Sequence, residues 1–328
     1  MRHLLALSFL VLPAMAFAQT RALIVTGLGA EPKYQQQFMA LGERLSTALV
    51  TKYGIPEANV TWLGEDSTSK VKSYKGRSTS VAILRELDLI ATSAKPNEQV
   101  IVVLIGHGSG QGEDSKFNIP GPDIAARDFN LEPKRFGAQR LAFLNLTTAS
   151  GDALPILSFP NRIVVTSTKS AYERNESQFA RFFVEALDKS GAADVDKDGR
   201  VSLLEAYRYA ATETRRSYEA DERLMTEHAQ LDDDGNGKGS DLPDGRSAGD
   251  GLLARRFFLD GGAGGARQGS SDPRMNKLYT DKFEIEDRID ALKQRKASMK
   301  EDAYYAQLEP LLVSLARVAR DIRQGEGR

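Results

Sequence analysis

Cysteine is absent from the 328-residue chain, which excludes disulfides and every mechanism that uses a thiol nucleophile. The sequence also lacks an excess of charge of one sign, because it contains 44 basic and 45 acidic residues and has a net charge of −1. The charge balance therefore does not favour nucleic acid or an anionic membrane as a partner. With 27% charged and 41% hydrophobic residues, the composition is typical of globular proteins.

The N-terminus carries the one long apolar run, at residues 4–15, after a basic start at residues 2–3. Residues 16–18 (Ala-Phe-Ala) then place small side chains where a signal peptidase cleaves. The pattern predicts a signal peptide at residues 1–18 and export to the periplasm or the extracellular space. A membrane anchor is the alternative, but the run is too short to span a bilayer comfortably.

Predicted strands alternate with predicted helices through the first two thirds of the chain. β-Branched or apolar runs predict strands at 22–26, 60–63, 99–105, 141–146 and 162–166, and apolar residues at helical spacing predict helices over 35–52, 79–90 and 179–187. This alternation predicts an α/β fold, a three-layer sandwich around a mostly parallel sheet. The main domain is expected over residues 19–260, with residues 254–259 as one further strand.

The C-terminal region has a different composition. Residues 261–274 are rich in glycine and predict a flexible linker. Residues 275–328 carry two apolar stripes at helical spacing, which predict a helical hairpin with its turn near residues 297–298. Such a hairpin packs on itself, on the domain, or on a protein partner, and the partner could be a second copy of the chain.

Residues 194–205 fit the twelve-residue calcium loop of an EF-hand at each diagnostic position. The expected ligands are Asp194, Asp196, Asp198, the carbonyl of Arg200, Ser202 (directly or through water) and Glu205. Gly199 permits the sharp turn at the sixth position, and both flanks look helical. Carboxylates that converge in this way repel one another unless a hard dication lies between them. We therefore expect bound Ca²⁺ as a cofactor, in a structural role.

A second, incomplete calcium loop starts at Asp232. Asp232, Asp234 and Asn236 stand at its first, third and fifth positions, but proline occupies the twelfth. Asp241 or Asp244 could replace the missing carboxylate. A plain Asp/Gly turn is an equally good interpretation.

His107 follows the predicted buried strand at 99–105 and is flanked by glycines. The next predicted strand, 141–146, ends in Thr147-Thr148-Ala149-Ser150-Gly151. Carboxyl ends of neighbouring parallel strands form the usual active-site edge of open α/β sheets. The two ends are therefore expected to face each other across one crevice.

The strand followed by His-Gly-Ser, the later strand ending in Ser-Gly, and the strand at 164–168 resemble the caspase and legumain group of cysteine peptidases. The similarity is greatest to bacterial legumain-like proteins and covers residues 21–260. In that group a cysteine stands two residues before the Ser-Gly pair, and here Thr148 occupies this position. The resemblance assigns His107 and Thr148 to the catalytic positions, and it assigns Lys169, Glu173 and Arg174 to the substrate pocket. The alternative for these three is a solvated turn.

A threonine hydroxyl is neither ionised nor strongly nucleophilic near neutral pH, and the group's acidic neighbour is replaced by Ala149. The sequence therefore favours a catalytically inactive peptidase homologue that binds calcium and a peptide or protein. Two alternatives remain open. One is an active peptidase that uses Thr148, Thr147 or Ser150 with His107. The other is a cell-envelope scaffold that acts through the C-terminal helices.

Overall fold

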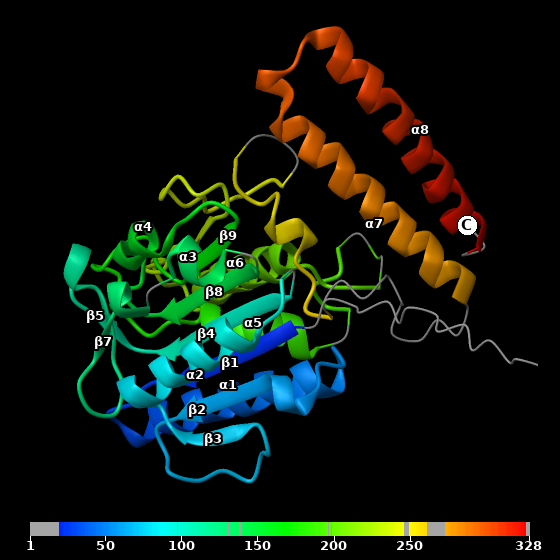
Figure 1. Cartoon of the computed structure of the whole chain (residues 1–328). Coiled ribbons are helices and arrows are strands. Elements are labelled where there is room, and N and C mark those ends of the chain that lie inside the picture. Colours follow the sequence, from blue (N-terminus) through cyan, green and yellow to red (C-terminus); the bar gives the residue numbers. More distant parts are fainter. Residues whose placement is uncertain are drawn as a thin grey trace, which may run out of the picture.

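The computed structural model describes residues 20–325 except 97, 130, 138, 190, 196, 198, 246–248 and 261–272. The predicted signal peptide lies outside these residues, as does the predicted linker apart from its last two positions. Figure 1 shows an α/β body that carries the sheet and two long C-terminal helices beside it.

Within the described residues, one seven-stranded sheet has the strand order β10-β9-β8-β4-β1-β2-β3. Its strands are β1 (Thr20–Thr26), β2 (Val60–Gly64), β3 (Tyr74–Arg77), β4 (Gln99–Gly106), β8 (Arg140–Thr147), β9 (Arg162–Thr166) and β10 (Gln230–Asp232). Every neighbouring pair is parallel except β9 and β10, so the expected mostly parallel sheet is confirmed. A small antiparallel sheet follows β4 and contains β5 (Gly108–Ser109), β6 (Lys116–Phe117) and β7 (Ile124–Ala125).

Helices cover both faces of the large sheet, because its central strands are apolar on both faces. Side chains of β1 alternate between two cores: Ile24 belongs to one, and Leu23 and Val25 belong to the other. The first core is closed by α1 (Pro32–Thr51), α5 (Phe179–Asp188) and α6 (Leu203–Ala220). The second is closed by α2 (Ser80–Ser93), α3 (Pro133–Phe136) and α4 (Leu154–Leu157). This arrangement agrees with a three-layer sandwich.

The strand expected at 254–259 is wrong. Ala254–Arg256 form a 3₁₀ turn, and only Phe258 makes an isolated bridge, to Ser202. The buried carboxylate of Asp233 accepts the backbone N–H groups of Leu253 and Ala254, at 2.9 and 2.8 Å, and so fixes a turn here. The outer strand on this side of the sheet is β10 instead.

The C-terminal residues form α7 (Pro273–Gln294) and α8 (Glu301–Gly325), which lie side by side (Figure 1). Their contact buries Ile289 and Leu292 of α7 against Tyr304 and Leu311 of α8. In Figure 1, α7 lies between the α/β body and α8, and Arg256 Nη2 donates to the Glu286 carbonyl of α7 at 3.3 Å. Among the described residues, no helix has the length and apolar character needed to cross a membrane.

Candidate functional site

The site lies at the carboxyl edge of the sheet, where β4 and β8 end side by side. The register pairs Gly106, the last residue of β4, with Thr147, the last residue of β8. His107 and Thr148 directly follow these two paired residues. The backbone N–H of Thr148 donates to the Gly106 carbonyl at 3.4 Å and continues the ladder. The structure therefore brings the two sequence-predicted positions to one edge.

The imidazole of His107 packs against α1 rather than against a hydroxyl. Tyr34 and Phe38 contact it edge-on, with ring centroids at 5.0 and 5.1 Å. No polar atom of the described residues hydrogen-bonds to the ring. Burial lowers the pKa of His107, and the charges of Glu176 and Glu31 oppose this shift. The neutral imidazole is consequently favoured.

Thr148 uses its hydroxyl for the backbone of the neighbouring strand. Its Oγ1 accepts the N–H of Gly108 at 3.2 Å, and the residue is only 3% exposed. The hydroxyl of Thr147 donates to Asn145 Oδ1 at 2.7 Å, and that of Ser150 lies 3.2 Å from Thr168 Oγ1. All three candidate nucleophiles thus have partners other than His107.

The loop after β8 is held against the loop after β9. Ala149 has a φ of +52°, which is rare for a residue with a side chain, and its N–H donates to the Glu173 carbonyl at 2.8 Å. A Cβ on Gly151 would lie 2.1 Å from the backbone carbon of Lys169, so the two loops touch. The strained turn persists because these contacts surround it.

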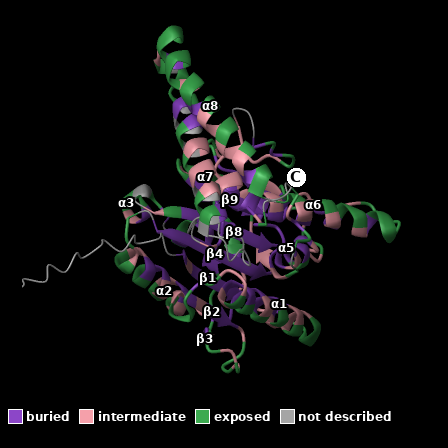
Figure 2. Ribbon diagram, turned by 90° about the vertical axis from the view of Figure 1, so that its right-hand side faces the viewer, coloured by how far each residue is buried: buried purple, intermediate pink, exposed green. Residues whose placement is uncertain are grey.

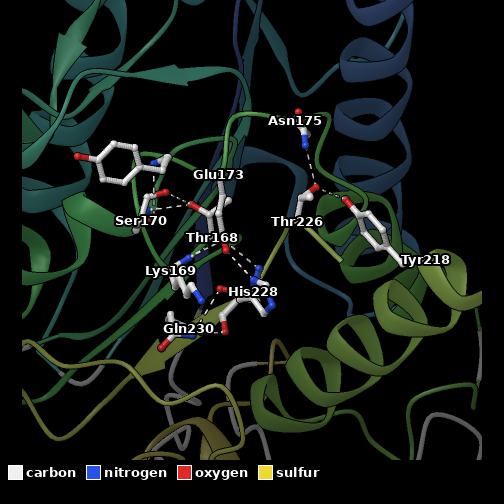
Figure 3. Close-up of polar contacts among 12 residues, drawn as sticks. Thr168, Lys169, Ser170, Glu173, Asn175, Tyr218, Thr226, His228 and Gln230 are labelled. Carbon is white, nitrogen blue, oxygen red and sulfur yellow. Dashed lines mark hydrogen bonds and ion pairs between the residues drawn. The ribbon is translucent and has the colours of Figure 1, made fainter. Parts of the chain in front are cut away.

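Glu173 stabilises this loop cluster and pairs with His228, as Figure 3 shows. One of its oxygens accepts the N–H groups of Lys169 and His228, each at 3.0 Å, and the other lies 2.6 Å from His228 Nδ1. Arg174 Nε donates to the Ala171 carbonyl at 2.9 Å. Of the three predicted pocket residues, Glu173 and Arg174 are therefore engaged within the protein.

The segment that carries His228 is also anchored by Glu227. The buried Glu227 carboxylate accepts the N–H groups of Gln178 and Phe179, at 2.8 and 3.0 Å, and so caps the start of α5. It also bonds the Ser177 hydroxyl. Burial outweighs these donors and raises the pKa of Glu227 to about 7. No local pattern in the sequence indicates these partners, because they are about fifty residues away along the chain.

Lys169 lines an open pocket of about 380 Å³, which Gly151 and Asp152 of the loop after β8 also line. The lining residues are Gly112, Gly151, Asp152, Leu154, Pro155, Lys169, Gln230, Gly237, Lys238 and Gly239. The ammonium groups of Lys169 and Lys238 form no ion pair with any described residue. Asp152 directs its two carboxylate oxygens to the N–H groups of Ala171 and Gly112, at 3.0 and 2.9 Å. The charged lining thus carries two cations and one anion.

The predicted EF-hand segment connects α5 to α6, and Asp196 and Asp198 lie outside the described residues. Asp194 Oδ2 accepts the Gly199 N–H at 3.0 Å, and Gly199 has the positive φ expected at the turn, +85°. Glu205 Oε1 accepts the Val195 N–H at 3.0 Å, and its other oxygen accepts the Ser202 N–H at 2.9 Å. Asp194 and Glu205 therefore both bond to the loop.

In the same segment, Ser202 and Glu205 form the capping box of α6. The guanidinium of Arg200 pairs with Asp260, with Nε at 3.0 Å from the carboxylate, and lies 3.7 Å above the Phe258 ring. These contacts fix the end of the loop to the α/β body.

The second loop brings three carboxylates together. Among the described residues, carboxylate oxygens of Asp232, Asp234 and Asp250 all lie within 4.8 Å of one another. The third carboxylate is Asp250 rather than Asp241 or Asp244. Asn236, a predicted ligand, uses its amide within the loop, with Oδ1 accepting the Lys238 N–H at 2.6 Å. The donor set of hard oxygen ligands is one that could hold a metal ion.

The electrostatics of this cluster agree with a cation site. Burial, together with the neighbouring charges of Asp234, Asp232 and Asp233, raises the pKa of Asp250 to about 6, although a hydrogen bond from the Asp233 backbone opposes the shift. Asp232 is 1% exposed and accepts the N–H groups of Gly235 and Gly237, at 3.0 and 2.9 Å. Close like charges of this kind favour a dication among them.

Comparison with known proteins adds no family assignment: no family model matches the chain, and no curated protein matches it.

The burial of His107 predicts a pH dependence of stability. The folded protein disfavours the imidazolium, whereas the unfolded chain binds a proton near the ordinary pKa of about 6.5. The free energy of unfolding should therefore fall as the pH drops below about 6.5. His107→Phe removes the titration and keeps an aromatic ring against Tyr34 and Phe38. Denaturant unfolding at about pH 7.5 and about pH 5 should show a smaller pH effect in the variant. An equal pH effect in both proteins contradicts the assignment.

Proposed function

We propose that the protein is an exported, calcium-binding homologue of the caspase and legumain group that binds acidic peptides without cleaving them. The observation that carries the proposal is the position of the Thr148 hydroxyl. It accepts the N–H of Gly108, and no described hydroxyl hydrogen-bonds to His107. A hydroxyl nucleophile needs an aligned base, and an oxyanion needs free backbone donors. Here the imidazole of His107, in its favoured neutral form, packs against the rings of Tyr34 and Phe38. The backbone N–H of Gly108, a nearby donor, already bonds to Thr148.

Acidic peptides are proposed because of the pocket beside this edge. Lys169 and Lys238 face it from two different loops without a paired carboxylate among the described residues. The single acidic group, Asp152, is held by backbone N–H groups. A carboxylate side chain of a peptide would form charge-assisted hydrogen bonds with the two ammonium groups. The pocket opens next to Gly151, so the remaining peptide would run along the carboxyl edge of the sheet.

Calcium is proposed at two loops with different roles. In the segment 194–205, Asp194 and Glu205 would hold Ca²⁺ together with the other positions of the pattern, and the ion would join α5 to α6. At the second loop, Asp232, Asp234 and Asp250 would hold the ion. Because Gly237 and Lys238 belong to both this loop and the pocket wall, an ion there would stabilise the wall. Export is consistent with Ca²⁺ as the ion, since extracellular modules bind it at millimolar levels.

The calcium proposal predicts a rise in melting temperature when Ca²⁺ is added. A ligand at about one hundred times its dissociation constant stabilises the folded state by about 2.7 kcal/mol. Asp232→Asn with Asp250→Asn should remove part of the rise, and Glu205→Gln should remove another part. Glutamine preserves the capping box of α6, so Glu205→Gln separates loss of the ion from loss of the cap. A rise that is unchanged in both variants contradicts binding at these loops.

The peptide proposal predicts a preference for acidic sequences in a binding assay. Fluorescence anisotropy with labelled acidic peptides, and with the same peptides carrying Gln and Asn, should show tighter binding of the acidic set. Lys169→Ala with Lys238→Ala should weaken the acidic peptides about tenfold, because charge-assisted hydrogen bonds are lost. Lys95→Ala is a matched control, since Lys95 is exposed just after α2, away from the pocket lining. Equal binding of both peptide sets would refute the proposal.

A further inference from the structure

Helix α8 has two faces that carry apolar side chains, and the described residues cover only one of them. Tyr304 and Leu311 pack against α7, whereas Tyr305, Leu312 and Val313 are 49%, 47% and 43% exposed. The uncovered side belongs to a set of exposed residues at helical spacing, which we call the outer face: Asp302, Tyr305, Glu309, Leu312, Val313, Ala316, Arg320 and Arg323. Figure 2 shows exposed residues along α8 where it extends from the body. A helix that is apolar over so wide an arc is typical of a bundle with more than two helices.

The charges of the outer face are ordered along the helix. Asp302 and Glu309 lie toward its start, the apolar residues lie in the middle, and Arg320 and Arg323 lie toward its end. Two pairs of these positions are complementary about the centre of the face, and Glu309 has Ala316 as its counterpart. Asp302 and Arg323 are equally distant along the chain from the Leu312–Val313 pair, and so are Tyr305 and Arg320.

We infer that the outer face of α8 binds the outer face of a second copy of this chain, with the two helices antiparallel. A two-fold axis at Leu312 and Val313 brings Asp302 of each copy to Arg323 of the other, and Tyr305 to Arg320. The contact then joins apolar centres, carboxylate–guanidinium pairs and a guanidinium on an aromatic ring. A parallel pairing would place like charges together, which is unfavourable.

The second copy is the occupant that this face fits, because the face is complementary to itself. Two-fold interfaces use the same patch on both subunits, and such a patch must carry both signs of charge in reversed order about its centre. The α/β body leaves the face uncovered, since α7 lies between the body and α8 (Figure 1). The dimer therefore goes beyond the proposed peptide binding and presents two pockets in one particle.

Sedimentation of the mature full-length chain tests the dimer by charge exchange. The wild-type protein should sediment with twice the monomer mass at micromolar concentrations. Arg323→Asp should weaken association about tenfold or more, because it faces Asp302 with a like charge. Asp302→Arg combined with Arg323→Asp should restore association. Gln307→Glu adds charge to an exposed site on α8 outside the outer face and should have no effect. The inference would be overturned if the wild-type protein were a monomer at about 100 µM, or if the double variant associated as weakly as Arg323→Asp alone.

The absence of cysteine allows the orientation to be tested by single substitutions. Tyr305→Cys and Arg320→Cys variants should form a mixed disulfide when combined under oxidising conditions, because the two positions meet across the antiparallel contact. If the Tyr305→Cys variant forms disulfide-linked dimers with itself in preference to the Arg320→Cys variant, the two helices are parallel and the inference is overturned.

Discussion

The parallel pairing of β4 with β8 is the constraint on which the rest of the structure depends. Both strands are apolar on both faces, so helices must cover the sheet from two sides. Their shared register also ends them side by side, and this places His107 next to the loop that carries Thr148. The chain after β10 turns back so that Ser240 pairs with Leu231, and this return brings Lys238 to the same pocket as Lys169 of the loop after β9, although the two lysines lie far apart in the chain.

At this edge the chemistry depends on one side chain. A cysteine near His107 would be partly ionised and intrinsically nucleophilic, whereas Thr148 carries a hydroxyl that forms a backbone hydrogen bond instead. The aromatic contacts of His107 and the Glu173–His228 pair give this edge a network that stabilises loops without assembling a base and a nucleophile. Such an arrangement is suited to holding a ligand, and the proposed calcium sites would add rigidity to loops that are rich in glycine and aspartate.

Most strands and helices of the α/β body could be predicted from the sequence, because they depend on the spacing of apolar residues within one short segment. Apolar runs such as 99–105 became buried strands, and the helical spacing over 35–52 became α1. Long-range partners could not be found in this way. Asp250 joins Asp232 and Asp234 because the chain folds back after a turn, and Asp233 fixes that turn by accepting the N–H of Gly251 at 2.8 Å. The same carboxylate explains why residues 254–259, whose composition favours a strand, begin with a 3₁₀ turn.

The central claim is that the carboxyl edge of the sheet binds peptides without cleaving them. Its most direct test is to measure hydrolysis of a diverse fluorogenic peptide library by the mature protein with calcium present. His107→Ala and Thr148→Ala variants are measured beside it. The account predicts that the wild-type protein shows no turnover above that of the two variants, because no aligned base activates a hydroxyl. Turnover that is present in the wild-type protein and lost in both variants would establish a hydroxyl-dependent peptidase and contradict the account.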